Sequence, residues 1–323
     1  MSQFNRRVYS ISIVYTVLFG LITTIPSVAE NTVEIPVEFA LDSQTRLDLI
    51  ERLRNTRLLN EEEIYTQLNL TGPKGIGPSE RPKHQSFLTH NPYEPAFEIE
   101  LTALTYTIPE NKNSWELVRA DKYFRFRGQE PVLQWYSGKT ENQAVCAIQF
   151  IKEDKVDYRL STFNSAADAK KEGYIVTHHN HCGTCSSLKN LAVYLEIFDM
   201  TTEARDCGRK RGAKNVKICL MESMGLQERC AEAWAYNSQH TRKYCTDICV
   251  KHYGLWNLLR NNVNKPHNDE DGNLNPCLAC DEQVSGPGFQ FFAGRTRRNS
   301  GIESAVFRPA NEILSVDHSL YFD

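Results

Sequence analysis

The sequence predicts an α+β fold in which a mainly antiparallel sheet packs against a disulfide-stapled helical half. Residues 96–178 contain several short segments of alternating apolar and polar residues bounded by turn residues, as strands do. Residues 179–253 place apolar residues at helical spacing. The chain has 10 cysteines, an even number that suits a disulfide framework. Together these observations favour a sheet beside a set of covalently joined helices.

The composition is that of an ordinary globular protein. Of the 323 residues, 41% are hydrophobic and 24% are charged, which is enough to bury a sizeable core in one large domain or two smaller ones. The formal net charge is -3. Because the chain has no excess of basic residues, we expect no nucleic-acid partner.

The N-terminus has the order of residues found in a secretory signal peptide. Two arginines precede an apolar run over residues 8–25, and the small residues Ser27, Val28 and Ala29 follow. We expect residues 1–29 to be a signal peptide cleaved after Ala29, so that the mature protein is secreted or periplasmic. The alternative is an uncleaved membrane anchor, because the run approaches the roughly 20 residues that cross a bilayer. No later segment predicts a membrane span.

Residues 30–95 are expected to form an N-terminal arm that precedes the main domain. Residues 33–39 alternate like a short strand, and their proline places that strand at an edge. A helical pattern begins at Asp42 or Ser43, either of which suits an N-cap. Residues 71–95 are rich in proline, glycine and polar residues, which predicts an irregular connector.

The main domain, residues 96–323, divides into three parts. The sheet-rich part, 96–178, is interrupted by one short helix over residues 165–173 that ends at a glycine. The Cys-rich helical part is 179–253. Residues 254–323 contain a linker and an arginine-rich segment with strand-like residues on both sides. The expected N-caps of the helical part are Ser186 or Ser187, Thr201 and Thr246.

Disulfides are the expected state of the cysteines, because an exported chain meets an oxidising compartment. Each native bridge typically contributes ~2 to 4 kcal/mol. Cys245 and Cys249 are four residues apart, so both lie on one helical face. The sequence does not determine the pairing. The candidates for structural disulfides are Cys146, Cys207, Cys219, Cys230, Cys245, Cys249, Cys277 and Cys280.

A cluster of reactive residue types lies at residues 178–187, HHNHCGTCSS, where a strand leads into a helix. The macrodipole and the free backbone amides of a helix N-terminus favour a thiolate. Cys182 is therefore a candidate nucleophile with His178 or the distant His318 as its base, and Cys185 is a candidate resolving thiol. The alternative is that both cysteines are locked in structural disulfides.

The same cluster contains residue types that bind metals. Thiolates combined with imidazoles suit copper or zinc, so His178, His179 and His181 form a candidate metal site. A second CxxC pair, at residues 277–280, lies much farther along the chain than the roughly 15 to 20 residues that separate the pairs of a zinc ribbon. The cofactor is thus unassigned, with copper and zinc as candidates.

Three arginines follow one another closely between two glycines near the C-terminus. Planar guanidinium groups bind carboxylate, phosphate or sulfate through paired hydrogen bonds. We expect this segment to return to the HHNHCGTCSS cluster and to orient a small anionic substrate there. The candidate substrate-binding residues are Arg295, Arg297 and Arg298. The alternative is that they pair with surface carboxylates, namely those of Asp281, Glu282 and Glu303.

Two patterns in the chain, VTHxxxCGxCSSL and CLxCDExxSGPxF followed by AGRTRRxSG, resemble a family of exported cysteine-rich proteins of unassigned activity. The resemblance covers residues 160 to 320. It implies one coherent domain and no particular reaction. The residues carried over from it are Thr177, His178, Cys182, Gly183, Cys185, Ser186, Arg295, Arg297, Arg298 and Gly301.

The leading functional hypothesis is an exported enzyme, an oxidoreductase that uses a Cys/His site, as thiol or metal, on a small anionic substrate. One alternative is a noncatalytic disulfide-stabilised binding or structural module. Another is a hydrolase or transferase with a cysteine nucleophile. Whether Cys182 and Cys185 bond to each other, to distant cysteines or to nothing separates these hypotheses. The sequence does not indicate the oligomeric state.

Overall fold

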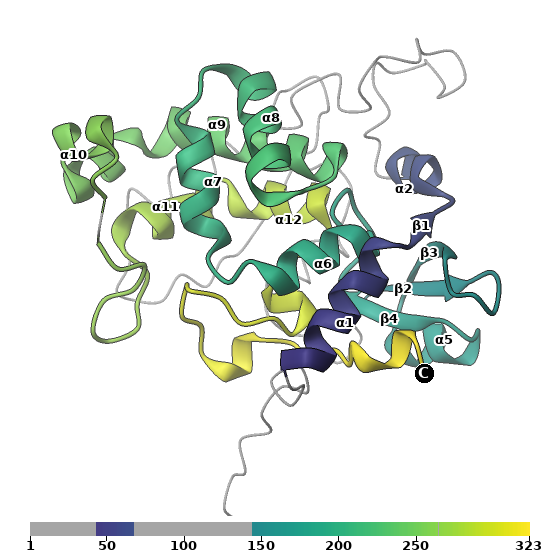
Figure 1. Ribbon diagram of the computed structural model, residues 1–323. Helices are drawn as coiled ribbons and strands as arrows, with labels where there is room; N and C mark the ends of the chain where they lie inside the picture. The colour runs from purple at the N-terminus through teal and green to yellow at the C-terminus, as the bar shows by residue number, and fades with distance from the viewer. Residues whose placement is uncertain (1–42, 68–143, 264) are drawn as a thin grey trace, which may run out of the picture. The chain divides into compact units, whose positions relative to one another are not determined.

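The computed structural model describes residues 43–67, 144–263 and 265–323 (Figure 1). Helices and a four-stranded, mostly antiparallel sheet occur together in these ranges, so the prediction of a mixed helix-and-sheet fold with a mainly antiparallel sheet is confirmed. The predicted signal peptide, most of the predicted N-terminal arm and the segments predicted as strands before residue 144 lie outside the described residues. The division of the chain into domains stays a prediction.

The sheet has the strand order β1-β3-β2-β4 and is mostly antiparallel. β2 (Val145–Phe150) pairs antiparallel with β3 (Asp157–Phe163) and with β4 (Ile175–His179). β1 (Arg57–Leu58) runs parallel to β3. The first four residues of β2 are buried, as befits a central strand. β2, β3 and β4 coincide with segments predicted from alternation, whereas a strand of two residues has too little periodicity to be predicted.

The short helix predicted between β3 and β4 is α5 (Ala166–Lys171). Ser165 is its N-cap, since its side chain accepts a hydrogen bond from the Asp168 amide. The chain leaves the helix through Gly173, whose φ of 77° is accessible to glycine without strain. Ala169 of α5 packs against buried residues of β2, and so covers one face of the sheet.

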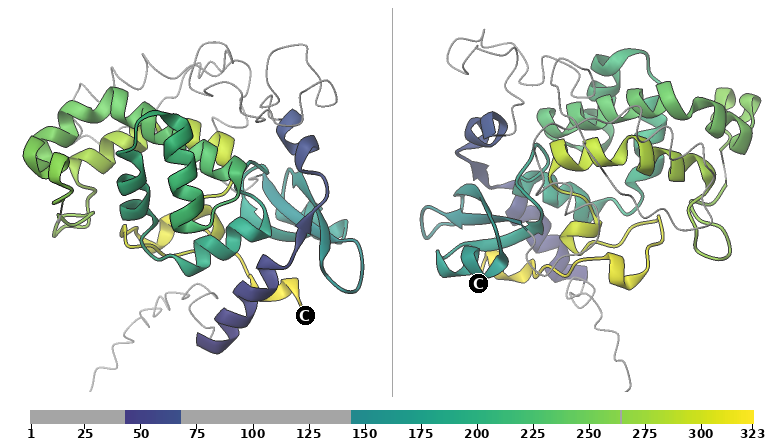
Figure 2. Two further views of the ribbon diagram at one scale, coloured as in Figure 1. Left: turned by 45° about the horizontal axis from the view of Figure 1, so that its top comes forward. Right: turned by 180° about the vertical axis from the view of Figure 1, so that it is seen from behind.

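The helical half follows β4, and α7, α8 and α9 lie side by side in it (Figure 2). In the described part of the chain, no helix is both long and apolar enough to cross a membrane. The helices after β4 are α6 (Leu188–Glu196), α7 (Met200–Gly208), α8 (Gly212–Met224), α9 (Glu228–Tyr253), α10 (Leu255–Arg260), α11 (Pro276–Val284) and α12 (Gly286–Ala293). Two helices precede the sheet strands β2 to β4, α1 (Ser43–Arg54) and α2 (Glu61–Gln67), and the short 3-10 turns near the C-terminus are η4 (Arg298–Ser300), η5 (Ala310–Glu312) and η6 (Ser319–Tyr321).

The helix starts are partly those predicted. Ser187 is the N-cap of α6 and accepts a hydrogen bond from the amide of Asn190. The cap predicted at Thr201 is wrong, because Asp199 takes that role for α7. The cap at Thr246 is also wrong, because this residue lies inside the continuous helix α9 and its hydroxyl donates to a carbonyl one turn earlier. The strand-like residues before the arginines form α12 instead.

The main core lies between the sheet and the helices. It is built from the apolar face of α1, the inner face of the sheet, and side chains of α6, α8, α9 and α12. Burial of each large apolar side chain contributes roughly 1.5 to 3 kcal/mol, so this core holds the two halves of the fold together. Its largest fully buried apolar members include Leu53, Ile148, Leu188, Leu191 and Phe292.

All ten cysteines are paired in five disulfides. One bridge joins β2 to the CGTC segment, and another joins that segment to α9. One joins α7 to α8, and two join α9 to α11. Five disulfides are typical of proteins folded in an oxidising, extracellular compartment. The pairs are Cys146–Cys182, Cys185–Cys230, Cys207–Cys219, Cys245–Cys280 and Cys249–Cys277.

Candidate functional site

The CGTC segment lies in the turn between β4 and α6, as the strand-to-helix pattern predicts. Cys182 and Cys185 do not bond to each other. Cys182 is bridged to Cys146 on β2, and Cys185 to Cys230 on α9. Both side chains are buried. A thiol reaction at either position would therefore begin with the reduction of a bridge that connects two elements of the core.

His178 is buried and takes part in the turn itself. Its Nδ1 donates to the carbonyl oxygen of His179 at 2.8 Å, and its Nε2 accepts from the Ser186 hydroxyl at 2.7 Å. The same hydroxyl oxygen accepts the Gly183 amide at 2.7 Å. Burial and the nearby positive charge of Arg295 hold the pKa of His178 well below its usual range. The neutral ring thus fixes the geometry of the turn.

The structure does not bring the side chains of the three histidines together. His178 and His179 are consecutive residues of β4, so their side chains point to opposite faces of the sheet. His179 faces the carbonyl of Ser315 at 3.2 Å, and His181 hydrogen-bonds the side chain of Asn180 at 2.9 Å. Throughout the described ranges, no group of three or more histidine, cysteine, aspartate or glutamate side chains could hold a metal ion.

The CGTC segment crosses the end of α12 at backbone contact distance. A Cβ atom added to Gly183 would lie 2.5 Å from the carbonyl carbon of Ala293 and from the nitrogen of Gly294. The amides of Thr184 and Cys185 donate to the carbonyls of Phe292 and Ala293, both at 2.8 Å. The close packing therefore requires glycine at both Gly183 and Gly294. The crossing brings the arginine segment back to the CGTC turn, as predicted.

Arg295 is fully buried at the centre of this crossing. Its guanidinium donates to the backbone carbonyls of Thr177, Cys185 and Ser186. It also donates to the hydroxyl of Thr177 at 2.6 Å and to that of Ser300 at 3.1 Å. The N–H donors of the guanidinium thus bind groups of the protein itself, and Arg295 connects β4, the start of α6 and η4.

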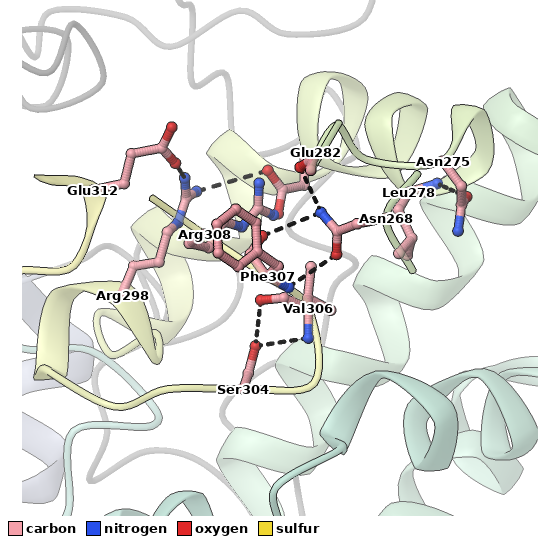
Figure 3. A network of polar contacts seen from close by, with 11 residues as sticks. Asn268, Asn275, Leu278, Glu282, Arg298, Ser304, Val306, Phe307, Arg308 and Glu312 are labelled. Atoms are coloured by element: carbon pink, nitrogen blue, oxygen red, sulfur yellow. Dashed lines mark hydrogen bonds and ion pairs between the residues drawn. The ribbon is translucent and has the colours of Figure 1, made fainter. Parts of the chain in front are cut away.

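The other two arginines have separate partners. Arg297 donates to the carbonyl oxygens of Tyr194 and Ile197 at 2.6 and 2.7 Å, and so satisfies the free carbonyls at the C-terminus of α6. It also donates to the backbone carbonyl of Glu303 rather than to its carboxylate. Arg298 forms ion pairs with Glu282 and Glu312 (Figure 3), the first of which is among the alternative pairings expected from the sequence.

A groove with a volume of about 1130 Å³ lies beside the arginine segment. Helices α7, α9, α10, α11 and α12 line it together with the chain between residues 296 and 308. The groove is larger than most pockets for small ligands, which occupy roughly 300 to 1000 Å³. Its aromatic lining residues are Phe198, Trp234, Tyr253, Phe289 and Phe307. These aromatic residues come from four separate parts of the sequence, so no local sequence pattern predicts the groove.

Two polar atoms in the wall of the groove are buried without a hydrogen-bond partner in the described structure, Nε of Arg205 and Oδ1 of Asp206. Such atoms are rare in native proteins and mark places where a ligand or water completes the hydrogen bonding. Nearby, the buried carboxyl of Asp281 accepts hydrogen bonds from Thr241 and Asn237, and burial raises its pKa.

The charged residues that line the groove are mostly basic. Arginine and lysine residues outnumber acidic ones. Because burial raises the pKa of Asp281, its carboxyl stays neutral to a higher pH than an exposed carboxyl does. The positive potential of the lining favours an anionic ligand. The basic lining residues are Arg205, Arg209, Lys210, Arg242, Arg297, Arg298 and Arg308, and the acidic ones are Asp206, Asp281, Glu282 and Glu303.

One lip of the groove is a fixed strip of polypeptide, residues 304–308. Asn268 accepts a hydrogen bond from the Phe307 amide at 2.9 Å and donates to the Phe307 carbonyl at 3.2 Å (Figure 3). Glu282 of α11 forms ion pairs with Arg308 of this strip and with Arg298. These contacts hold the C-terminal segment against α11 and preserve the groove beneath it.

The fold and the groove define a disulfide-stabilised protein of mixed helix and sheet with an aromatic, basic groove beside its arginine segment. Residues 213–316 match a family described as a family of unknown function (DUF8771). This stretch runs from α8 past the arginines and contains most of the groove, whereas the CGTC turn precedes it. No curated protein and no solved structure matches the chain. The family match agrees with the expectation of an uncharacterised family.

Proposed function

We propose that this protein is an exported binding module without catalytic activity, whose ligand occupies the groove. The observation that carries this proposal is that Cys182 and Cys185 each lie in a bridge to a different element. A cysteine nucleophile or a dithiol redox centre requires a thiolate. With all ten cysteines paired and His178 buried in the turn, the groove is the better candidate for function.

The groove favours a ligand with an apolar body and an anionic group. Aromatic side chains such as Trp234 and Phe289, whose ring centroids lie 4.7 Å apart, provide a rigid apolar surface. The excess of basic residues and the unpartnered Nε of Arg205 favour a negatively charged head group. This refines the small anionic ligand expected from the sequence, and moves it from the CGTC turn to the groove.

Export is supported by two independent features. Residues 1–29 have the order of a cleaved signal peptide. The five disulfides need an oxidising compartment to form and persist. We therefore propose that the mature chain begins after Ala29 and is released from the cell or into the periplasm.

A thiol count on the secreted protein tests the noncatalytic part of the proposal. We expect no thiol to react with Ellman's reagent in the native or the urea-denatured protein, and no copper, zinc or iron by elemental analysis. Two reactive thiols assigned by peptide mapping to Cys182 and Cys185 would instead support the oxidoreductase or nucleophile hypotheses. A stoichiometric bound metal would support the metal version.

Ligand titration tests the groove. The probe is dodecanoate below its micellar concentration, with dodecanol as its uncharged counterpart, followed by calorimetry. We expect dodecanoate to bind at least tenfold more tightly than dodecanol. Phe198→Glu, at an exposed position of the groove, places a negative charge there and should weaken dodecanoate binding about tenfold or more. Ile151→Glu, at a position of similar exposure outside the groove, is the control. Equal loss in both variants would refute the groove as the site.

A further inference from the structure

The short helix α10 exposes a cluster of large apolar side chains to solvent. Leu255, Trp256 and Leu259 are 51%, 69% and 60% exposed. In a helix with 3.6 residues per turn, these three positions fall within one arc of roughly 100°. Single exposed apolar residues are ordinary, but three on one side of a six-residue helix form a patch.

The patch is held on a rigid support. The bridges Cys245–Cys280 and Cys249–Cys277 fix the last turns of α9 to α11, and α10 begins directly after α9 at Gly254 (Figure 1). The side chain of Asn257 donates to the carbonyl of Tyr253 at 2.9 Å. Arg209, which directly follows α7, donates to the carbonyl of Leu259 at 3.0 Å. Because its backbone is tied at both ends, α10 presents the apolar side chains in a fixed orientation.

The surroundings of the patch are basic. The stretch 248–265 contains Lys251, Arg260 and Lys265, all exposed, and no acidic residue. Lys265 donates to the carbonyl of His252, which places it beside the last turn of α9. The acidic residue directly before this stretch is the exposed Asp247, and those after it are in the loop that Asn268 holds against the C-terminal segment, so basic residues outnumber acidic ones around the patch. An apolar patch flanked by exposed basic side chains is complementary to the surface of an anionic bilayer.

We propose that α10 docks this protein on the surface of anionic lipid bilayers, with Leu255, Trp256 and Leu259 inserted at the level of the head groups. Tryptophan prefers this interface because one end of its ring is apolar and the other donates a hydrogen bond. The three side chains are too few to form the roughly 800 Å² that each partner contributes to a stable protein interface. Leu255 and Leu259 also line the groove whereas Trp256 does not, so Trp256→Ala tests docking without altering the groove.

Vesicle flotation with the mature disulfide-bonded chain tests the proposal. We expect binding to vesicles of phosphatidylcholine and phosphatidylserine at 4:1, and at least tenfold weaker binding to phosphatidylcholine alone. Trp256→Ala should reduce the partition coefficient at least tenfold, and the double variant L255D/L259D should abolish binding. Lys251→Gln with Arg260→Gln should remove the preference for the anionic vesicles. Because these side chains are exposed, the variants should unfold like the native protein in urea.

Two controls make the outcome decisive. Ile218→Asp alters an exposed apolar residue of α8, and Phe198→Glu alters the groove; both should bind vesicles as the native chain does. Equal binding by Trp256→Ala and the native chain would overturn the proposal. So would a dimer seen by analytical ultracentrifugation that Trp256→Ala dissociates, because the patch would then bind a second copy of the chain.

Discussion

Replacement of Gly183 by alanine tests whether the CGTC turn depends on close contact between two backbones. The added Cβ would lie 2.5 Å from backbone atoms of Ala293 and Gly294, about 1 Å inside ordinary van der Waals contact. Backbone atoms cannot rotate away, so the two segments must separate. Separation breaks the hydrogen bonds from the amides of Thr184 and Cys185, at roughly 1 kcal/mol each. Strain in a close-packed core adds roughly 1 to 3 kcal/mol.

We therefore expect Gly183→Ala to lower the free energy of unfolding by about 4 kcal/mol, out of the 5 to 15 kcal/mol typical of a folded domain. Urea denaturation at pH 7, with the disulfides intact, measures this change. Gly208→Ala is the matched control, because its Cβ would lie 3.5 Å from atoms of Ser238 at an ordinary contact distance. We expect that control to change stability by less than about 1 kcal/mol. Similar values for both variants would refute the role assigned to the crossing.

Three further predictions concern charged and titratable groups, each measured by urea denaturation. Burial and the charge of Arg295 lower the pKa of His318 to about 4; its contribution to stability is full above pH 6.5 and is lost as the pH falls toward 4, at about 1.4 kcal/mol per pH unit. His318→Asn should flatten that slope, and an unchanged slope would show that other groups cause it. Because burial raises the pKa of Asp281, ionisation of its carboxyl opposes folding as the pH rises through that pKa. Asp281→Asn should therefore stabilise the protein at pH 7 but not below pH 3.8. A destabilising effect at pH 7 would contradict this. Arg297→Met should lower the free energy of unfolding by about 1 to 3 kcal/mol, because it leaves the carbonyls of Tyr194 and Ile197 without their donor. Arg298→Met removes solvent-screened ion pairs and should lower it by less than about 1 kcal/mol. The reverse order would be inconsistent with these contacts.

The parts of the fold that were predictable depend on neighbouring residues. The alternation in β2, β3 and β4 follows from a sheet with one buried face, and the helix α5 carries its own cap, Ser165, and its own terminating glycine. The prediction of strand-like structure at α12 is wrong because GFQFFA is a short apolar run, and periodicity alone does not separate a strand from a buried helix at that length. The prediction of an N-cap at Thr246 is wrong because threonine is also tolerated inside a helix when its hydroxyl donates to an earlier carbonyl.

The candidate site was harder to predict because its partners are distant in sequence. The sequence places Gly183 and Gly294 in distinctive patterns. It does not reveal that the two backbones are in contact, so that a Cβ at either position would clash with the other segment. A dense run of arginines ordinarily lies on the surface and binds anions. Here Arg295 is buried because backbone carbonyls of β4 and of the residues just before α6 accept hydrogen bonds from its guanidinium. A cluster of chemically reactive residue types can thus lie where two chain segments cross. The residues that form the groove carry no local motif because they come from several helices and from the chain between residues 296 and 308.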